Sequence, residues 1–182
     1  HLDSGVVYEG KLYCGHSNYP DLPMSSSAEI WDCESLEHIG SHDLGSVWGS
    51  CTWIDRFDDH WWAVFGHYDR FATQTGKDNR WTVLVQFNDD WRPLAEWTFP
   101  DSLLTLFKPM SCSGGSWGPD HRLYVTGHDS AALYVLRPPA SGSALQWLAT
   151  VPVDIQGQGI AWDRSEPGVL WHQATPAPGR CF

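Results

Sequence analysis

Three glycine–histidine pairs recur along the chain, and each follows a run of apolar residues that is typical of a β-strand. They are Gly15-His16, Gly66-His67 and Gly127-His128, and Asp129 follows the last of them directly. A fourth histidine, His172, follows a shorter apolar run. Neutral imidazole is the commonest metal ligand among protein side chains. The sequence therefore raises the hypothesis of a metal site with His16, His67, His128 and Asp129 as ligands.

The spacing of the histidines argues against a site that uses all of them. The segments WAVFGH and LYVTGH place His67 and His128 in the same register. The shorter LYCGH shifts His16 by one residue, and VLWH shifts the last histidine by about two. A shift of one residue turns a side chain to the opposite face of a strand. Two alternatives stay open: a smaller site of two or three histidines with Asp129 or Asp3, and polar residues that only hydrogen-bond the loop backbone.

Short strands are the elements that would position these residues. Strand-like runs alternate with turn residues at spacings of about ten residues, and helical periodicity is almost absent. We expect hairpin turns at Glu9 and Gly10, at 32–35 and at 88–90. One short helix is expected in the connection 100–109, with Asp101 as its N-cap. Two successive hairpins form a unit of four antiparallel strands, and such units recur along the chain.

The repeated unit has the size and strand content of a β-propeller blade, so we predict an all-β fold of four-stranded antiparallel blades. The predicted blades cover residues 1–46, 47–108 and 109–154, and a half blade covers 155–182. About three and a half blades are fewer than the roughly four to eight of a propeller. We therefore expect residues upstream of His1 to complete the ring, and open blade edges that favour self-association.

Two segments carry a resemblance to a known group of repeats. RLYVTGHDSAALYVL resembles the YVTN-type repeat, and AEIWDCESLEHIGSHDLG looks like the outer hairpin of the same repeat. More broadly, the chain is similar to bacterial propellers of the YVTN, NHL and gluconolactonase-like kind. Such families include lactonases, lyases and plain binding modules, so the resemblance implies a fold without one activity. It also favours a secreted or periplasmic location, where propellers of this kind are common.

In a propeller, the loops that follow the second strand of each blade and those that enter the next blade emerge on one face, where ligands usually bind. The predicted binding face consists of His16, Asn18, Tyr19, His67, Tyr68, Arg70, Ser111, Ser113, His128, Asp129, Gln158 and His172. Beside them we expect His1, Asp3, Ser4, Ser17, Ser50, Gln156 and Gln173.

Two functions fit this face. The first is a binding or scaffold module that presents the face to a small polar ligand or a peptide. The alternative is a metal-assisted hydrolase or lyase of the lactonase-like kind, whose cofactor would be one divalent ion that polarises a carbonyl or activates water. The sequence contains no HExxH zinc motif, so it gives the metal enzyme no recognised ligand pattern, and we prefer the binding module.

The composition limits the classes of binding partner that we expect. The net charge is −11 and the 11 basic residues are scattered, which argues against nucleic acid or an anionic membrane surface as partner. No apolar run approaches the roughly 20 residues of a membrane-spanning helix.

Cysteines and tryptophans are expected mainly in the core. The five cysteines lack CxxC spacing, which predicts small buried residues in strands and leaves at least one thiol free. Among the 12 tryptophans, we expect Trp61, Trp62, Trp81, Trp91 and Trp97 to pack between strands. Trp48 and Trp117 lie where an exposed ring could stack on a sugar.

Overall fold

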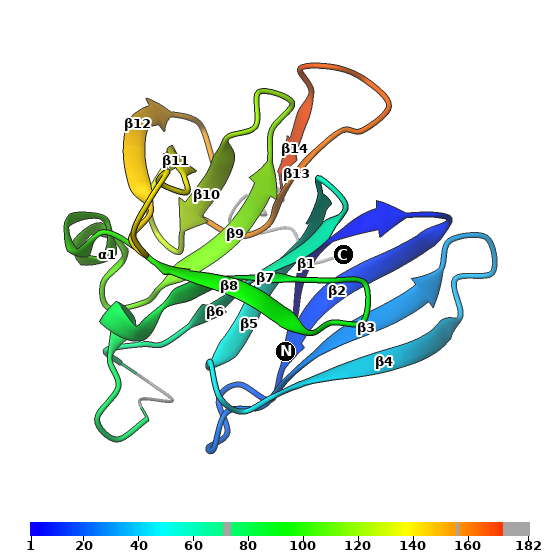
Figure 1. The fold of residues 1–182 in the computed structure, drawn as a ribbon, viewed down its shortest axis with the longest axis horizontal. Coiled ribbons are helices and arrows are strands. Elements are labelled where there is room, and N and C mark those ends of the chain that lie inside the picture. The colour runs from blue at the N-terminus through cyan, green and yellow to red at the C-terminus, as the bar shows by residue number, and fades with distance from the viewer. Residues whose placement is uncertain (71–73, 156, 173–182) are drawn as a thin grey trace, which may run out of the picture.

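The computed structural model describes residues 1–70, 74–155 and 157–172, and these residues form short antiparallel strands (Figure 1). The first eight strands are β1 (Leu2–Tyr8), β2 (Lys11–Ser17), β3 (Ser26–Asp32), β4 (His38–Gly45), β5 (Ser50–Phe57), β6 (His60–Gly66), β7 (Val83–Phe87) and β8 (Pro93–Thr98). The remaining strands are β9 (Cys112–Trp117), β10 (Leu123–Gly127), β11 (Ala132–Arg137), β12 (Gln146–Pro152), β13 (Ile160–Trp162) and β14 (Leu170–His172). A 3-10 turn, η1 (Asn79–Trp81), and one helix, α1 (Asp101–Phe107), complete the described elements. The predicted all-β character is confirmed.

The strands form three sheets within the described residues. An eight-stranded sheet has the order β4-β3-β2-β1-β5-β6-β7-β8, a second sheet has the order β12-β11-β10-β9, and β13 pairs with β14. All pairs within the large sheet are antiparallel except β1 with β5, which meet in parallel at Ser4 and Trp53. The large sheet therefore consists of two four-stranded antiparallel units that are joined by one short parallel strand pairing.

Local turn chemistry explains the hairpins, and the predicted turns are confirmed. Glu9 and Gly10 adopt positive φ angles of 49° and 73° between β1 and β2, as a tight hairpin turn requires. The Asp32 carboxylate accepts hydrogen bonds from the backbone N–H groups of Glu34 and Ser35 at 3.1 and 2.7 Å. Asn88 accepts in the same way from the N–H groups of Asp90 and Arg92. These side chains hold the β3–β4 and β7–β8 turns.

The predicted capping of α1 by Asp101 is wrong. Pro100 occupies the N-cap position, and no side chain makes a capping hydrogen bond there. Asp101 is already the first helical residue, whereas a side chain caps from the position before it. Its carboxylate still lies in the first turn, where the helix dipole favours negative charge.

Alternating side chains of β6 connect two parts of the core. Trp61, Ala63 and Phe65 pack toward Ala28 and Leu44 of the first unit. Trp62 and Val64, on the opposite face of the strand, pack with Leu103 and Phe107 of α1 and with Val125 and Leu136 of the β9–β12 sheet. A third group, formed by Leu133, Ile155 and Ile160, joins that sheet to the β13–β14 hairpin. Successive units therefore stack face to face through strands that are apolar on both sides.

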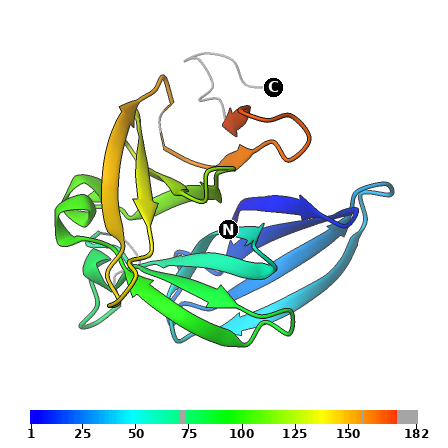
Figure 2. The same cartoon turned by 45° about the horizontal axis from the view of Figure 1, so that its top comes forward.

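The first strands of the successive units come together in the middle of the molecule. β5 contacts both β1 and β9, and β13 contacts both β9 and β1 (Figure 2). Glycines permit this approach: a Cβ added at Gly115 would lie 2.4 Å from the Trp53 ring, and one at Gly159 would lie 2.6 Å from the Cβ of Ser4. At the centre of the molecule, Gly115 of β9 therefore faces Trp53 of β5, and Gly159, directly before β13, faces Ser4 of β1.

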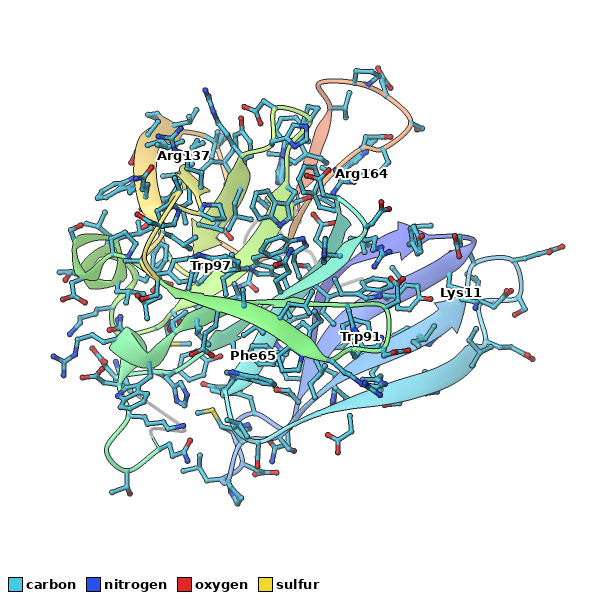
Figure 3. The ribbon with its side chains drawn as sticks, in the orientation of Figure 1. Lys11, Phe65, Trp91, Trp97, Arg137 and Arg164 are labelled. Atoms are coloured by element: carbon cyan, nitrogen blue, oxygen red, sulfur yellow. The ribbon has the colours of Figure 1, made fainter. Side chains whose placement is uncertain are left out.

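A buried carboxylate on β5 ties three of these units together. Asp55 Oδ2 accepts hydrogen bonds from Ser116 Oγ at 3.0 Å and from the Trp117 N–H at 2.7 Å, both on β9. Arg164, from the β13–β14 connection (Figure 3), donates from Nη2 to both carboxylate oxygens at 2.9 and 2.8 Å. Burial raises the pKa of the Asp55 carboxyl, and the guanidinium and the N–H donors oppose that rise. The contact of Arg164 with both carboxylate oxygens favours the ionised form of Asp55, and its partners replace the water that the carboxylate has lost.

Replacing either member of this pair should destabilise the fold strongly. Asp55→Asn or Arg164→Met alone should lower the free energy of unfolding by about 3 kcal/mol, because each leaves a charged partner without its counter-ion. The double variant should lose less than the sum of the two, as measured by urea denaturation in a double-mutant cycle.

Arg122→Met is the control, because its pair with Asp120 is exposed and should contribute less than about 1 kcal/mol. Additive losses in the cycle would contradict the assigned coupling.

Candidate functional site

The loops that leave β2 and β6 bring together part of the predicted face. The rings of Tyr19 and Tyr68 lie 5.1 Å apart between centroids in an edge-to-face arrangement, and the His1 ring lies 5.7 Å from Tyr19. The amino group of His1 donates to the Ser17 carbonyl oxygen at 2.7 Å, which places the start of β1 against the end of β2. Aromatic rings from two units thus meet at the predicted end of the sheets.

Beside these rings lies a group of polar side chains that we call the hydroxyl cluster: Asp3, Ser17, Ser50 and Tyr68. Ser17 Oγ and Ser50 Oγ are 2.8 Å apart and share a hydrogen bond, and the Tyr68 side chain also hydrogen-bonds Ser50. Burial raises the pKa of Tyr68, so its phenol keeps its proton as a hydrogen-bond donor at neutral pH. The cluster therefore brings together buried hydroxyl groups from β2, from β5 and from the loop after β6.

Asp3 is the acidic member of the cluster. Its side chain is only 14% exposed, and its Oδ1 lies 3.4 Å from Nε2 of His1. Burial raises the pKa of the Asp3 carboxyl to about 7, against a smaller lowering by the amino-terminal charge. A carboxyl with this pKa changes its protonation state close to neutral pH, and both states exchange hydrogen bonds with a bound molecule.

Two further hydroxyl groups on the first strands are buried without a hydrogen-bond partner among the described residues. They are Ser4 Oγ on β1 and Thr52 Oγ1 on β5. A buried hydroxyl group that lacks a partner costs about 1–3 kcal/mol. Such atoms mark places where a water molecule or a ligand would restore the lost hydrogen bonds.

A separate pocket of about 300 Å³ opens on the other side of His67, and we call it the Trp48 pocket. Its lining residues are Val47, Trp48, His67, Lys77, Arg80, Trp81, Val83, Glu96 and Thr98. Trp48 packs against Phe65 and Phe87 of the core, and its Nε1 donates to Glu96 Oε2 at 3.3 Å. The pocket thus combines two tryptophans with charged groups of both signs.

His67 is buried and neutral. Its exposed fraction is 1%, and burial, assisted by the charge of Lys77, lowers its pKa. Nε2 lies 2.7 Å from the carbonyl oxygen of Trp48, which only accepts, so Nε2 carries the proton and Nδ1 is an acceptor. Nδ1 is buried and has no hydrogen-bond partner in the described part of the chain.

The predicted metal ligands do not come together. The His16 ring bonds Ser27 at 3.1 Å, His67 bonds the backbone near Trp48, and His128 Nδ1 contacts Asp129 Oδ1 at 2.6 Å. Over residues 1–70, 74–155 and 157–172, no three histidine, cysteine or acidic side chains are grouped so that they could hold a metal ion. His16 contacts a side chain of the neighbouring β3, His67 contacts the backbone just before β5, and His128 contacts the next residue in the sequence.

Other residues of the predicted face support loops. Asn18 donates from Nδ2 to the Pro23 carbonyl and accepts from the Ser25 N–H, which closes the loop after β2. Ser111 Oγ lies 2.6 Å from Thr82 Oγ1. The backbone oxygen of Gln158 accepts from Thr126 at 2.7 Å.

The remaining predicted residues lie on strands or loops. Ser113 is half-buried on β9, and Arg70 and His172 are exposed. Gln156 and Gln173 lie outside the described residues.

The structure also shows which of the described cysteines and tryptophans are buried and which are exposed. Cys14, Cys51 and Cys112 are buried as predicted, Cys33 is exposed, and all four are free thiols, while Cys181 lies outside the described residues. Trp117 is buried, so it offers no surface for a sugar. Trp81, expected in strand packing, is instead 54% exposed at the end of η1.

Lys77, Trp81 and Glu96 are site residues that the sequence analysis missed. Trp81 is placed by Asn79, whose buried side-chain amide donates to the carbonyls of Leu104 and Met110. These contacts join segments far apart in the sequence, so no local pattern marks them. The cluster of charges around Trp81 (Lys77, Asp78, Arg80) was the available signal.

Comparison of this chain with models of known protein families found no match, and comparison with curated proteins found none either. Within the described residues, no helix has the length and apolar character needed to cross a membrane.

The buried Asp3 carboxyl should make stability depend on pH. The folded state binds this proton more tightly than the unfolded state, whose pKa is near 3.8. The free energy of unfolding should therefore fall as pH rises from about 4 to 7, by about 3 kcal/mol from this group alone. This fall is measured by urea denaturation of the wild type and of Asp3→Asn at several pH values.

The difference between the two curves isolates Asp3 from the titration of the histidines. Asp90→Asn, which alters an exposed carboxylate in the β7–β8 turn, should leave the slope unchanged. Parallel curves for the wild type and Asp3→Asn would contradict the raised pKa.

Proposed function

We propose that this chain is a binding module of the β-propeller type that takes a small polar ligand at the hydroxyl cluster. The observation that carries the proposal is Asp3, a largely buried carboxyl whose charge acts on the phenol of Tyr68, which in turn hydrogen-bonds Ser50. A buried carboxyl is costly unless it is paired or hydrogen-bonded. A ligand that donates hydrogen bonds to it would remove that cost.

Three features support the propeller interpretation of the fold. β1–β4, β5–β8 and β9–β12 are each antiparallel units with the strands in sequence order. Their apolar faces stack in succession. The first strand of each unit lies innermost, next to that of the following unit. This is the order expected of blades around a common axis.

The chemistry of the cluster favours a ligand with both a cationic and a hydroxyl group. An ammonium group would pair with Asp3, and the adjacent tyrosine rings offer negative π-faces to the same charge. Ser50 and Tyr68 can exchange hydrogen bonds with a hydroxyl group. Small amino alcohols meet all these requirements.

The metal-assisted hydrolase stays a prediction of the sequence without a specific structural observation in its favour. It needs at least a few converging ligands for a divalent ion. His16, His67, His128 and Asp129 each have another contact in the structure. We therefore retain the binding module as the function the geometry supports best.

Ethanolamine is a suitable first probe, because it carries one ammonium and one hydroxyl group. We expect it to bind at pH 8, where Asp3 is ionised, and to bind about tenfold more weakly to Asp3→Asn, since a charge-assisted hydrogen bond contributes about 1.5–3 kcal/mol. Tyr68→Phe should weaken binding by a smaller factor. Isothermal titration calorimetry measures the ethanolamine affinities of the wild type and of both variants.

Asp129→Asn is the matched control, because it removes an exposed carboxylate and should bind ethanolamine like the wild type. Equal affinities of the wild type and Asp3→Asn would refute the proposed site.

A further inference from the structure

The Trp48 pocket has features of a second binding site, separate from the hydroxyl cluster. Its volume of about 300 Å³ lies at the lower end of the range for small-molecule pockets. His67 lines the pocket, and the Nε2 edge of its imidazole ring lies against Trp48 and Gly49, just before β5. Its ligand would contact residues that the hydroxyl cluster does not use.

One wall of the pocket is an exposed aromatic surface. Trp81 leaves 54% of its surface open, and Val47 beside the pocket leaves 71% open. The Trp81 backbone is fixed, because its N–H bonds the Asp78 carbonyl and the neighbouring Asn79 is anchored in the core. A rigid, open indole ring is a stacking surface for the apolar face of a ligand ring.

Of the two cationic residues that line the pocket, Lys77 lacks an anionic partner within the described residues. Lys77 Nζ lies 5.5 Å from the centre of the Trp81 ring and donates to the Val47 carbonyl at 3.2 Å, and no described carboxylate forms an ion pair with it. Arg80, by contrast, is already paired with Asp78 through two of its nitrogens. Lys77 is therefore the group available to an anion, directly beside the aromatic surface.

Glu96 supplies acceptor oxygens to the pocket. Its Oε2 accepts from Trp48 Nε1, and the carboxylate has further lone pairs. Such an acceptor suits the hydroxyl groups of a ligand, because each hydroxyl group supplies one donor.

We propose that the Trp48 pocket binds an acidic sugar, a pyranose ring that carries a carboxylate. The ring stacks on Trp81, its carboxylate pairs with Lys77, and its hydroxyl groups donate to Glu96. An aromatic carboxylate would use Trp81 and Lys77 but would leave Glu96 without these donors. A neutral sugar would leave Lys77 without an anion.

Binding of glucuronate, glucose and benzoate by the intact chain tests the proposal. Isothermal titration calorimetry should show the tightest binding for glucuronate. Trp81→Ala should weaken it about tenfold, since the substituted ring is already exposed and the fold should survive. Lys77→Gln should weaken glucuronate binding severalfold, leave glucose binding unchanged and remove its dependence on salt.

Two variants serve as matched controls. Trp171→Ala removes an indole that is 62% exposed on β14, and Lys11→Gln removes a lysine at the β1–β2 turn, far from the pocket (Figure 3). Both should bind glucuronate like the wild type. Absence of glucuronate binding by the folded protein, equal binding by Trp81→Ala, or tighter binding of glucose or benzoate would each overturn the proposal. Asp3→Asn should leave glucuronate binding intact, so failure at the hydroxyl cluster is distinguishable from failure here.

Discussion

The buried Asp55 carboxylate is the interaction on which the arrangement of the units depends. It lies on β5 and receives donors from β9 and from the β13–β14 connection, so one charge fixes three segments relative to one another. Arg164 also donates to the Trp117 carbonyl at 2.8 Å, and the Trp162 N–H donates to Ser116 Oγ at 3.1 Å. Apolar stacking alone holds sheets together without defining how they are rotated. Directional bonds to a buried charge add that orientation.

The two candidate binding regions lie at the same end of the sheets but differ in construction. The hydroxyl cluster forms where the first strands of two units begin, so the packing of β1 against β5 places its residues. The Trp48 pocket forms from the β4–β5 connection, from η1 and from β8. The Trp81 side of this pocket depends on η1, which is held in place by the hydrogen bond from the Asn79 side chain to the Leu104 carbonyl. A rigid sheet thus supplies one region, and an anchored loop supplies the other.

The sequence predicted features that arise from neighbouring residues. The Asp32 and Asn88 turns were predictable because their side chains bond their own backbone two to four residues ahead. Trp61 and Trp62 were expected to pack between strands, and both are buried in the core. Contacts between distant segments were not predictable: Asp55 and Arg164 are 109 positions apart, and no periodicity connects them. The same limit applies to Trp81, whose exposure follows from the anchoring of Asn79 to the carbonyls of distant residues.

The separation of Asp55 and Arg164 also bears on how the chain folds. A ribosome completes residue 164 long after β5 and β6 have emerged, so Asp55 spends part of synthesis without its guanidinium partner. Closing a loop of this length carries an entropic cost before the ion pair can form. The first eight strands can pair earlier, because their hairpins are local. Docking of the β13–β14 hairpin is therefore a late event in the assembly of the chain, and it gives the buried Asp55 carboxylate its counter-ion.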